Sequence, residues 1–91
     1  MRLKWTRSAL ADLKGILEYI EQDSPQAARA LPAGFKQTAE HLTRHPLIGR
    51  RGEIEGTREL MLQRNYLLTY RVSSEAVEIL QIWHVAQKRY H

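Results

Sequence analysis

The 91-residue sequence contains no cysteine and only three prolines. Without cysteine, these residues can form neither a disulfide framework nor a thiolate zinc site, and their composition fits a reducing compartment. The sequence also has no apolar run near the roughly 18 residues that a membrane-spanning helix needs. Its first residues lack the apolar core of a signal peptide. We therefore expect a cytoplasmic protein without a membrane partner.

No strong excess of charge is confined to one part of the chain. The formal net charge is +4, and residues 1–45 and 46–91 each contain seven Lys/Arg and five Asp/Glu, which excludes a basic tail as the source of the charge. A basic balance indicates a nucleic acid or an acidic protein as a partner, although a soluble basic surface would explain it equally well. The length predicts a single domain spanning residues 1–91.

The first third of the sequence predicts a short strand and a helix. Residues 2–5 alternate between polar and apolar side chains, and Thr6 is a residue type that caps helix N-termini. The apolar residues that follow recur with helical spacing and form one stripe: Ala9, Leu13, Ile16, Leu17 and Ile20.

A second helix is expected to begin at Ser24-Pro25, a capping residue followed by a proline at the first helical position, and to end before Pro46. Pro32 and Gly34 interrupt its apolar pattern. Because an interior proline removes a hydrogen bond and clashes with the preceding turn, we expect a kink near residues 28–32, or a short helix followed by a longer one.

Three consecutive strands are expected in the second half, where branched and aromatic side chains are frequent. We place them at residues 58–62, 66–72 and 76–83, the last ending at His84. The final strand is apolar on both faces, with Val77 and Ile79 on one face and Leu80 and Ile82 on the other, which predicts a central position.

The connector of residues 46–57 contains three glycines and reads as an exposed loop. The order is therefore strand, helix, helix and three strands. It predicts an α+β fold in which a helical pair packs on one face of a mainly antiparallel sheet.

Most motifs that carry chemistry are missing. The sequence has no P-loop, dinucleotide fingerprint, zinc-ligand spacing or paired catalytic carboxylates, and we expect no cofactor and no metal. His41 and His45 have the i, i+4 spacing that can place two imidazoles on one metal, but two solvated surface histidines are the favoured interpretation.

His84 is the residue most suggestive of catalysis. A histidine can act as a general acid or base near neutral pH, and arginines can hold a phosphate. Arg58, Arg64 and Arg71 come from neighbouring strands or their turn, so the four residues on one open sheet face would suit RNA cleavage by a 2′-hydroxyl. The alternative, which spacing alone favours, is that His84 is structural and the arginines are ordinary surface charges.

The aromatic residues are few, at 8% of the chain. Four of them lie at strand positions and are expected in the core rather than as stacking platforms for bases: Trp5, Tyr66, Tyr70 and Trp83. Tyr90 lies in the polar C-terminal segment and is the aromatic expected to be free. Lys88 and Arg89 in the same segment, with Arg64 and Arg71, are candidate contacts to a target or a nucleic acid.

Several short motifs in this order resemble the RelE/ParE superfamily of bacterial toxins across nearly the whole chain. The motifs are W-T-x-x-A-x-x-D-L from Trp5, H-P-x-x-G-R from His45, G-T-R-E-L from Gly56, Y-x-x-x-Y-R-V from Tyr66 and V-E-I-L-x-I-x-H ending at His84. The resemblance implies a growth-inhibiting toxin of a type II toxin–antitoxin module, neutralised by an antitoxin whose partly disordered segment wraps it.

The resemblance implies two kinds of target. RelE-like members cleave messenger RNA in the ribosome with a basic cluster and a C-terminal acid–base residue, whereas ParE-like members poison DNA gyrase. The motifs of this sequence resemble those of the ParE-like or plasmid-stabilisation branch. The positions where RelE-like nucleases carry cations hold Leu60, Leu62 and Leu67 here, so a nuclease site would be reduced to Arg58, His84 and Tyr90.

Our leading hypothesis is therefore a ParE-like toxin that acts by binding gyrase. The alternatives are a ribosome-dependent endoribonuclease and an antitoxin-binding domain that has lost toxicity. The predicted partners are a cognate antitoxin, the gyrase or ribosomal target, and operator DNA only indirectly through the antitoxin. An apolar helical stripe can order a disordered acidic segment, which makes Leu13, Leu17 and Ile20 the predicted antitoxin-binding residues.

Overall fold

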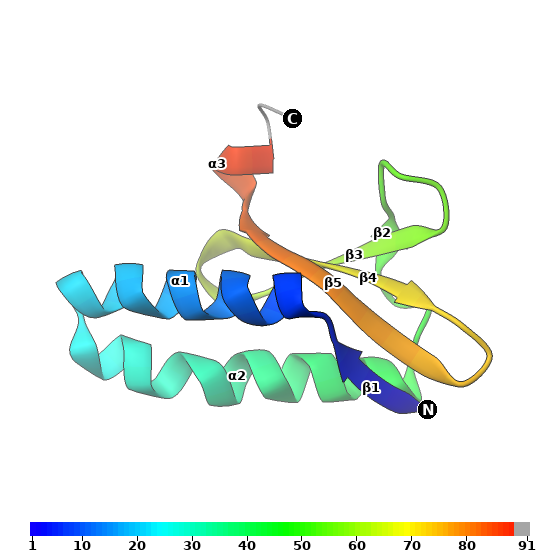
Figure 1. Cartoon of the computed structure of the whole chain (residues 1–91), viewed down its shortest axis with the longest axis horizontal. Helices are drawn as coiled ribbons and strands as arrows, with labels where there is room; N and C mark the ends of the chain where they lie inside the picture. Colours follow the sequence, from blue (N-terminus) through cyan, green and yellow to red (C-terminus); the bar gives the residue numbers. More distant parts are fainter. Residues whose placement is uncertain (89–91) are drawn as a thin grey trace.

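The computed structural model describes residues 1–88 and is organised as two long helices and a five-stranded sheet (Figure 1). The elements in chain order are β1 (Arg2–Trp5), α1 (Arg7–Asp23), α2 (Pro25–Arg44), β2 (Arg50–Arg51), β3 (Thr57–Met61), the 3₁₀ turn η1 (Gln63–Asn65), β4 (Tyr66–Val72), β5 (Ala76–His84) and α3 (Val85–Lys88).

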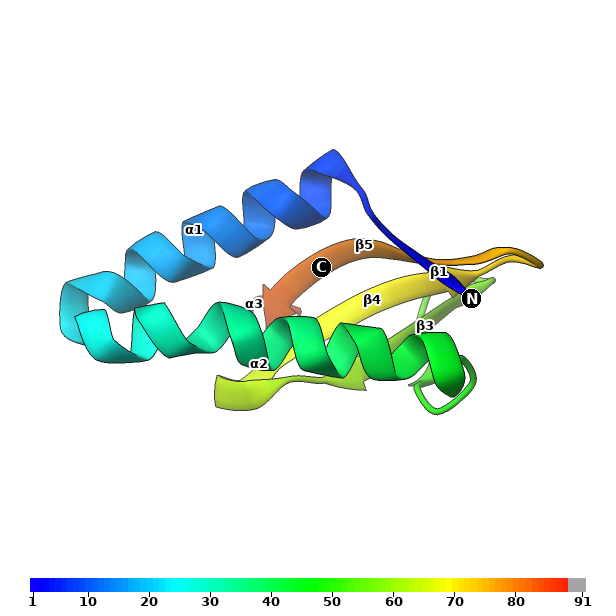
Figure 2. The same cartoon turned by 90° about the horizontal axis from the view of Figure 1, so that it is seen from below.

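The strands lie in the order β1-β5-β4-β3-β2, with β1 parallel to β5 and the other neighbours antiparallel. Figure 2 shows α1 and α2 side by side on one face of this sheet. The predicted α+β class and the central position of β5 are confirmed. No helix within residues 1–88 is long and apolar enough to cross a membrane.

Both helix starts follow the capping chemistry expected from the sequence. The Thr6 hydroxyl accepts a hydrogen bond from the backbone N–H of Ala9 at 3.1 Å, and the Ser24 hydroxyl accepts one from Ala27 at 3.2 Å. Thr6 also donates its hydroxyl proton to the carbonyl of Leu80 at 3.1 Å. The N-cap of α1 is thereby tied directly to the middle of β5.

The predicted division of the second helix is wrong, because α2 runs unbroken through Pro32 from residue 25 to residue 44. Its buried residues continue with helical spacing on both sides of the proline: Leu31, Phe35, Ala39 and Leu42. This burial offsets the roughly 3 kcal/mol that an interior proline costs. Gly34 has a packing role, since a Cβ there would lie 2.8 Å from the Gln63 side-chain nitrogen.

Strand β5 contains one extra residue, which the alternation of the sequence did not predict. Tyr70 of β4 pairs with Ile79 whereas Thr69 pairs with Gln81, so Leu80 is unpaired and forms a bulge. The bulge places Ile79 and Ile82 on the same, helix-facing side of the sheet, and both are buried. The prediction that these two residues face opposite sides is therefore wrong.

The connector is less open than predicted, because β2 pairs with β3 and Gly49 is buried. The Tyr70 hydroxyl accepts a hydrogen bond from the Gly49 N–H at 3.0 Å and donates one to the Pro46 carbonyl at 2.8 Å. A Cβ at Gly49 would lie 2.6 Å from that hydroxyl and from the Glu59 carbonyl, so only glycine allows this approach.

The core lies between the sheet and the two helices. Three of the four aromatic residues expected in it do contribute, but the expectation is wrong for Trp83, which is half-buried on the other face of the sheet. Tyr66 and Tyr70 are buried, and Trp5 packs against the same cluster. The Trp83 indole N–H donates to the Thr69 hydroxyl at 2.9 Å on the other face of the sheet.

Replacing Tyr70 by phenylalanine should destabilise the fold by about 1–3 kcal/mol, because the buried Gly49 N–H loses its acceptor. Urea denaturation measures this free energy of unfolding. Tyr19→Phe is the matched control, since Tyr19 is 65% exposed, and it should change stability by less than about 0.5 kcal/mol. Equal midpoints for the two variants would show that the Tyr70 hydroxyl does not hold the connector.

Candidate functional site

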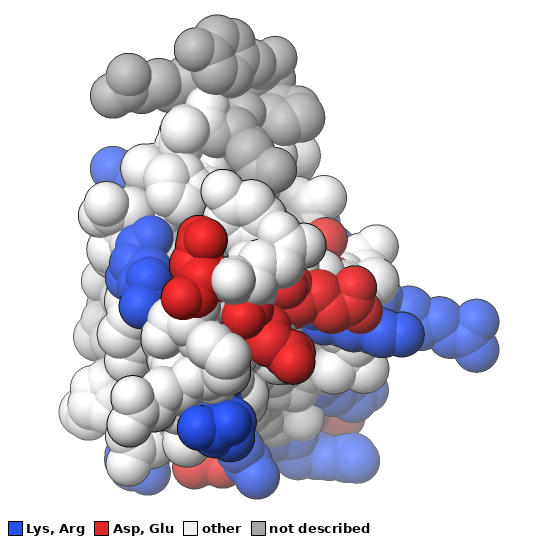
Figure 3. All heavy atoms as spheres, turned by 90° about the vertical axis from the view of Figure 1, so that its left-hand side faces the viewer, with Lys and Arg blue, Asp and Glu red and all other residues white. Residues whose placement is uncertain are grey.

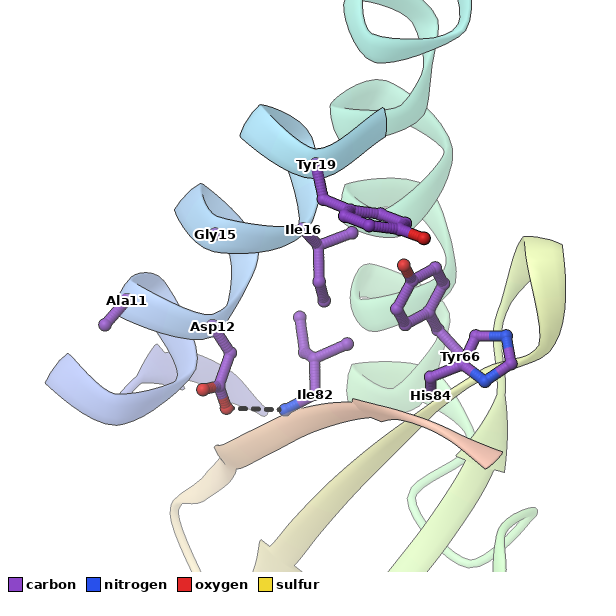
Figure 4. A pocket seen from close by; sticks show the side chains of 8 residues that line it. All are labelled: Ala11, Asp12, Gly15, Ile16, Tyr19, Tyr66, Ile82 and His84. Carbon is purple, nitrogen blue, oxygen red and sulfur yellow. Dashed lines mark hydrogen bonds between the residues drawn. The ribbon is translucent and has the colours of Figure 1, made fainter. Parts of the chain in front are cut away.

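A cavity of about 610 Å³ lies between α1 and the ends of β4 and β5. Figure 4 shows the eight residues that line it: Ala11, Asp12, Gly15, Ile16, Tyr19, Tyr66, Ile82 and His84. A smaller cavity of about 150 Å³ shares three of these residues and adds Ile20, Asp23, Ser24 and Arg64. We call the two together the His84 trough.

The α1 side of the trough is open because its residues are small. Ala11 and Gly15 are one helical turn apart, and a Cβ added to Gly15 would meet no atom within 4 Å. Asp12 is fixed below them, since its Oδ2 accepts a hydrogen bond from the backbone N–H of Ile82 at 3.0 Å (Figure 4). Asp12 therefore positions α1 against β5.

His84 ends β5 on the helix-facing side of the sheet, opposite Tyr66 in the register. Its ring meets the Tyr66 ring edge-on, with centroids 5.2 Å apart. Its Nδ1 accepts a hydrogen bond from the backbone N–H of Ala86 at 3.1 Å, which places the proton of the neutral ring on Nε2. The start of α3 thus orients the imidazole.

Two tyrosines face each other across the trough. Tyr66 is buried on β4, Tyr19 is exposed on α1, and their hydroxyls point toward one another in Figure 4. Burial raises the pKa of Tyr66 above 10.0, the nearby Tyr19 phenol raises it further, and the positive charge of Arg64 lowers it in part. The Tyr66 hydroxyl is therefore a protonated donor at neutral pH.

Arg64 reaches the trough from η1, where the backbone turns sharply. Arg64 and Asn65 both have left-handed backbone conformations, with φ of 60° and 63°. Asparagine tolerates this region, whereas a long side chain such as arginine rarely adopts it. The structure thereby brings Arg64 and His84 to one cavity.

Arg58 and Arg71 lie outside the His84 trough. Arg58 pairs with Tyr70, four residues along β4 from the partner of His84, which is roughly 13 Å of strand. Its Nη1 donates to the carbonyls of Gly49 at 2.8 Å and Leu47 at 3.3 Å. Arg71 follows Tyr70 and so faces the opposite side of the sheet, where it is exposed. The three arginines and His84 therefore do not share one open face.

The residues predicted to bind the antitoxin lie inside the fold. Ile20 is buried, and Leu13 and Leu17 pack against the core cluster. The apolar stripe of α1 thus covers the sheet and α2, and the structure gives it a packing role.

The C-terminal candidates are only partly described. Lys88 is the last residue of α3, whereas Arg89 and Tyr90 lie outside the described residues. His41 and His45 have ring centroids 4.7 Å apart on the exposed side of α2. Within residues 1–88, no group of three or more side chains could hold a metal ion.

Sequence reasoning missed Tyr19, Asp12 and Gly15 as part of a site. The available signal was a large aromatic residue placed off the apolar stripe of an amphipathic helix, where polar residues are usual. The surface at the α1–α2 turn is mixed: Figure 3 shows acidic groups in the middle of this face and basic groups at its sides. The described residues on this face form no continuous basic patch.

Comparison with known proteins defines the class. The sequence matches the family model for the "ParE toxin of type II toxin-antitoxin system, parDE" over residues 3–89. A curated protein of Sinorhizobium fredii, "Putative toxin Y4kP", is 41% identical over 88 residues, or 96% of this chain and 91% of that protein. "Toxin RelE2" of Caulobacter vibrioides is 39% identical over 83 residues, or 91% and 93%.

Solved structures of toxin–antitoxin systems are similar to this chain as well. A chain of the "Chromosomal ParDE TA system from P. aeruginosa" superposes with a TM-score of 0.84 at 31% identity, over 93% of this chain and 96% of that one. A chain of the "toxin-antitoxin complex RelBE2" from Mycobacterium tuberculosis gives 0.62 at 29%, over 91% and 95%. The protein is thus the toxin component of a type II toxin–antitoxin module, with a cognate antitoxin as its partner. The chain belongs to the ParE toxin family.

The buried phenols predict how stability depends on pH. Burial raises the pKa of both Tyr66 and Tyr70 above 10.0 in the folded state. Their contribution is therefore complete below the unfolded-state pKa and is lost as pH rises through the folded-state values. The free energy of unfolding, measured in urea between about pH 9 and pH 11, should fall with pH. Tyr66→Phe should reduce this slope, and an unchanged slope would contradict the assignment.

Proposed function

We propose that this toxin arrests growth by binding DNA gyrase and not by cutting RNA itself. The observation that carries the proposal is the placement of Arg58, whose guanidinium is bound to the Leu47 and Gly49 carbonyls far from His84. A phosphate-cleaving site needs its cation within reach of the acid–base group, because the charge to be stabilised develops on the same phosphate.

Two further positions, outside the trough, support the same proposal. Leu67, where a RelE-like nuclease would carry an arginine, is buried on the sheet face opposite the helices. Leu60 packs against the core cluster. The greater likeness to the ParDE chain than to the RelBE2 chain, with TM-scores of 0.84 and 0.62, points in the same direction.

An endoribonuclease is the second candidate, and the His84 trough is the observation that favours it. The trough combines an imidazole, two phenols and one guanidinium, from His84, Tyr66, Tyr19 and Arg64. In this reaction a 2′-oxygen attacks the adjacent phosphorus and the bond to the 5′-oxygen breaks. His84 would accept the 2′-proton, Arg64 would hold the phosphate, and a phenol would protonate the leaving oxygen. A relative named "Toxin RelE2" is consistent with this alternative.

The two functions predict different first events after expression of the toxin. Gyrase poisoning should give broken DNA and filamentous cells while translation continues, and purified toxin should make gyrase accumulate cleaved DNA. Ribonuclease action should stop translation at once and leave cut messages on ribosomes. Cleaved messages with intact DNA would overturn our proposal, and no growth arrest at all would favour a domain that binds antitoxin without toxicity.

His84→Ala separates the functions within the protein. If the imidazole is not catalytic, the variant should keep growth arrest within about threefold of the parent chain, because gyrase binding needs no proton transfer. His41→Ala is the matched control, since His41 lies on the exposed side of α2 away from the trough. A 100-fold or greater loss of toxicity for His84→Ala alone, at an unchanged unfolding midpoint, would favour the ribonuclease, since general acid–base catalysis contributes about 10²–10⁴-fold.

A further inference from the structure

A further cavity lies beside the loop that joins β2 and β3. This loop is at the opposite end of the molecule from the α1–α2 turn (Figure 1). Its volume is about 490 Å³, and it is lined by Leu47, Arg51, Gly52, Ile54, Glu55, Gly56, Thr57, Arg58 and Val72. We call it the loop cavity. None of the candidate site residues except Arg58 contributes to it.

The loop cavity presents aliphatic side chains to solvent. Leu47 is 65% exposed and Ile54 is 68% exposed, although both are large and apolar. The exposure of these two side chains does not come from an irregular, unbonded loop, because the backbone around both residues is hydrogen bonded. Thr57 donates both its N–H and its hydroxyl to the Ile54 carbonyl, at 3.1 Å and 2.6 Å, and Arg58 holds the Leu47 carbonyl.

The cavity also contains two like charges in direct register. Arg51 of β2 pairs with Arg58 of β3, and like charges at such positions destabilise a sheet. The neighbouring Arg50 is different, since it forms an ion pair with the buried Glu59 at 3.1 Å. Within residues 1–88, neither Arg51 nor Arg58 has a carboxylate oxygen within ion-pair distance. Among the lining residues that the structure describes, Glu55 is the only acidic one.

Exposed apolar side chains beside two arginines suit a ligand that has both a carboxylate and an aliphatic group. A carboxylate between the arginines would remove their repulsion, and an aliphatic side chain would cover the exposed surface. None of the lining residues within the described part of the chain has an aromatic ring, so these residues offer no platform on which a nucleobase could stack. These features favour a polypeptide over a nucleic acid.

We propose that the loop cavity binds an acidic, aliphatic segment of the cognate antitoxin. One Asp or Glu side chain of that segment lies between Arg51 and Arg58, and a neighbouring aliphatic side chain packs on Leu47 and Ile54. The net charge of +4 on the toxin supports an acidic partner. The proposal depends on the toxin–antitoxin class and not on gyrase as the target.

The test is the dissociation constant of the full-length toxin for its cognate antitoxin, measured by calorimetry. Arg51→Glu should weaken binding by about 10–100-fold, because it places a second carboxylate opposite the acidic segment. Ile54→Asp should weaken it by a similar factor, whereas Ile54→Leu should bind within about threefold of the parent chain. Arg29→Glu makes the same change of net charge on the exposed surface of α2 and should have little effect.

Charge reversal on the antitoxin identifies the partner group. One Asp→Lys or Glu→Lys change should restore binding to Arg51→Glu while weakening binding to the parent toxin. Parental affinity in both Arg51→Glu and Ile54→Asp would overturn the proposal. It would also be overturned if these variants lost toxicity at unchanged antitoxin affinity, because the surface would then belong to the growth target. Failure of free toxin to poison gyrase would leave these binding results unaffected.

Discussion

The extra residue in β5 is the constraint on which the rest of the structure depends. Because Leu80 has no partner on β4, the strand changes phase there, and Ile82 and His84 turn toward the helices. Two helix-borne groups satisfy the irregular backbone: Thr6 donates to the Leu80 carbonyl, and Asp12 accepts from the Ile82 N–H. Sheet irregularity, helix placement and the position of His84 are therefore one linked arrangement.

The two ends of β4 contribute to two different surfaces. At one end, Tyr66 stands beside His84 and forms the floor of the trough. At the other end, the Tyr70 hydroxyl and the Arg58 guanidinium bind the connector and hold the loop cavity open. The trough and the loop cavity are therefore separate surfaces at the two ends of one strand.

Arg58 illustrates why residue type alone is a weak guide to chemistry. An arginine on a strand near a histidine is compatible with phosphate binding, but the same five donors can also satisfy backbone carbonyls. Here the Nη1 group of Arg58 donates to the carbonyls of Leu47 and Gly49, and Arg64 is the cation that reaches His84. Arg64 has a left-handed backbone conformation in η1, the turn whose Gln63 side chain lies beside Gly34 of α2.

The sequence by itself determined the order of the two long helices and of four of the five strands, the helix caps, the α+β class and the toxin family, because capping chemistry and periodicity are local and the motifs are spread over the whole chain. Tertiary structure decided the features that depend on contacts between residues far apart in the sequence. It kept α2 continuous through Pro32, since burial on both sides offsets the lost hydrogen bond. It also placed the apolar stripe of α1 in the core and left the other side of that helix, with Tyr19, to form the trough. Which partner a side chain meets depends on strand register and on one bulge, and a single extra residue reverses the faces of a strand.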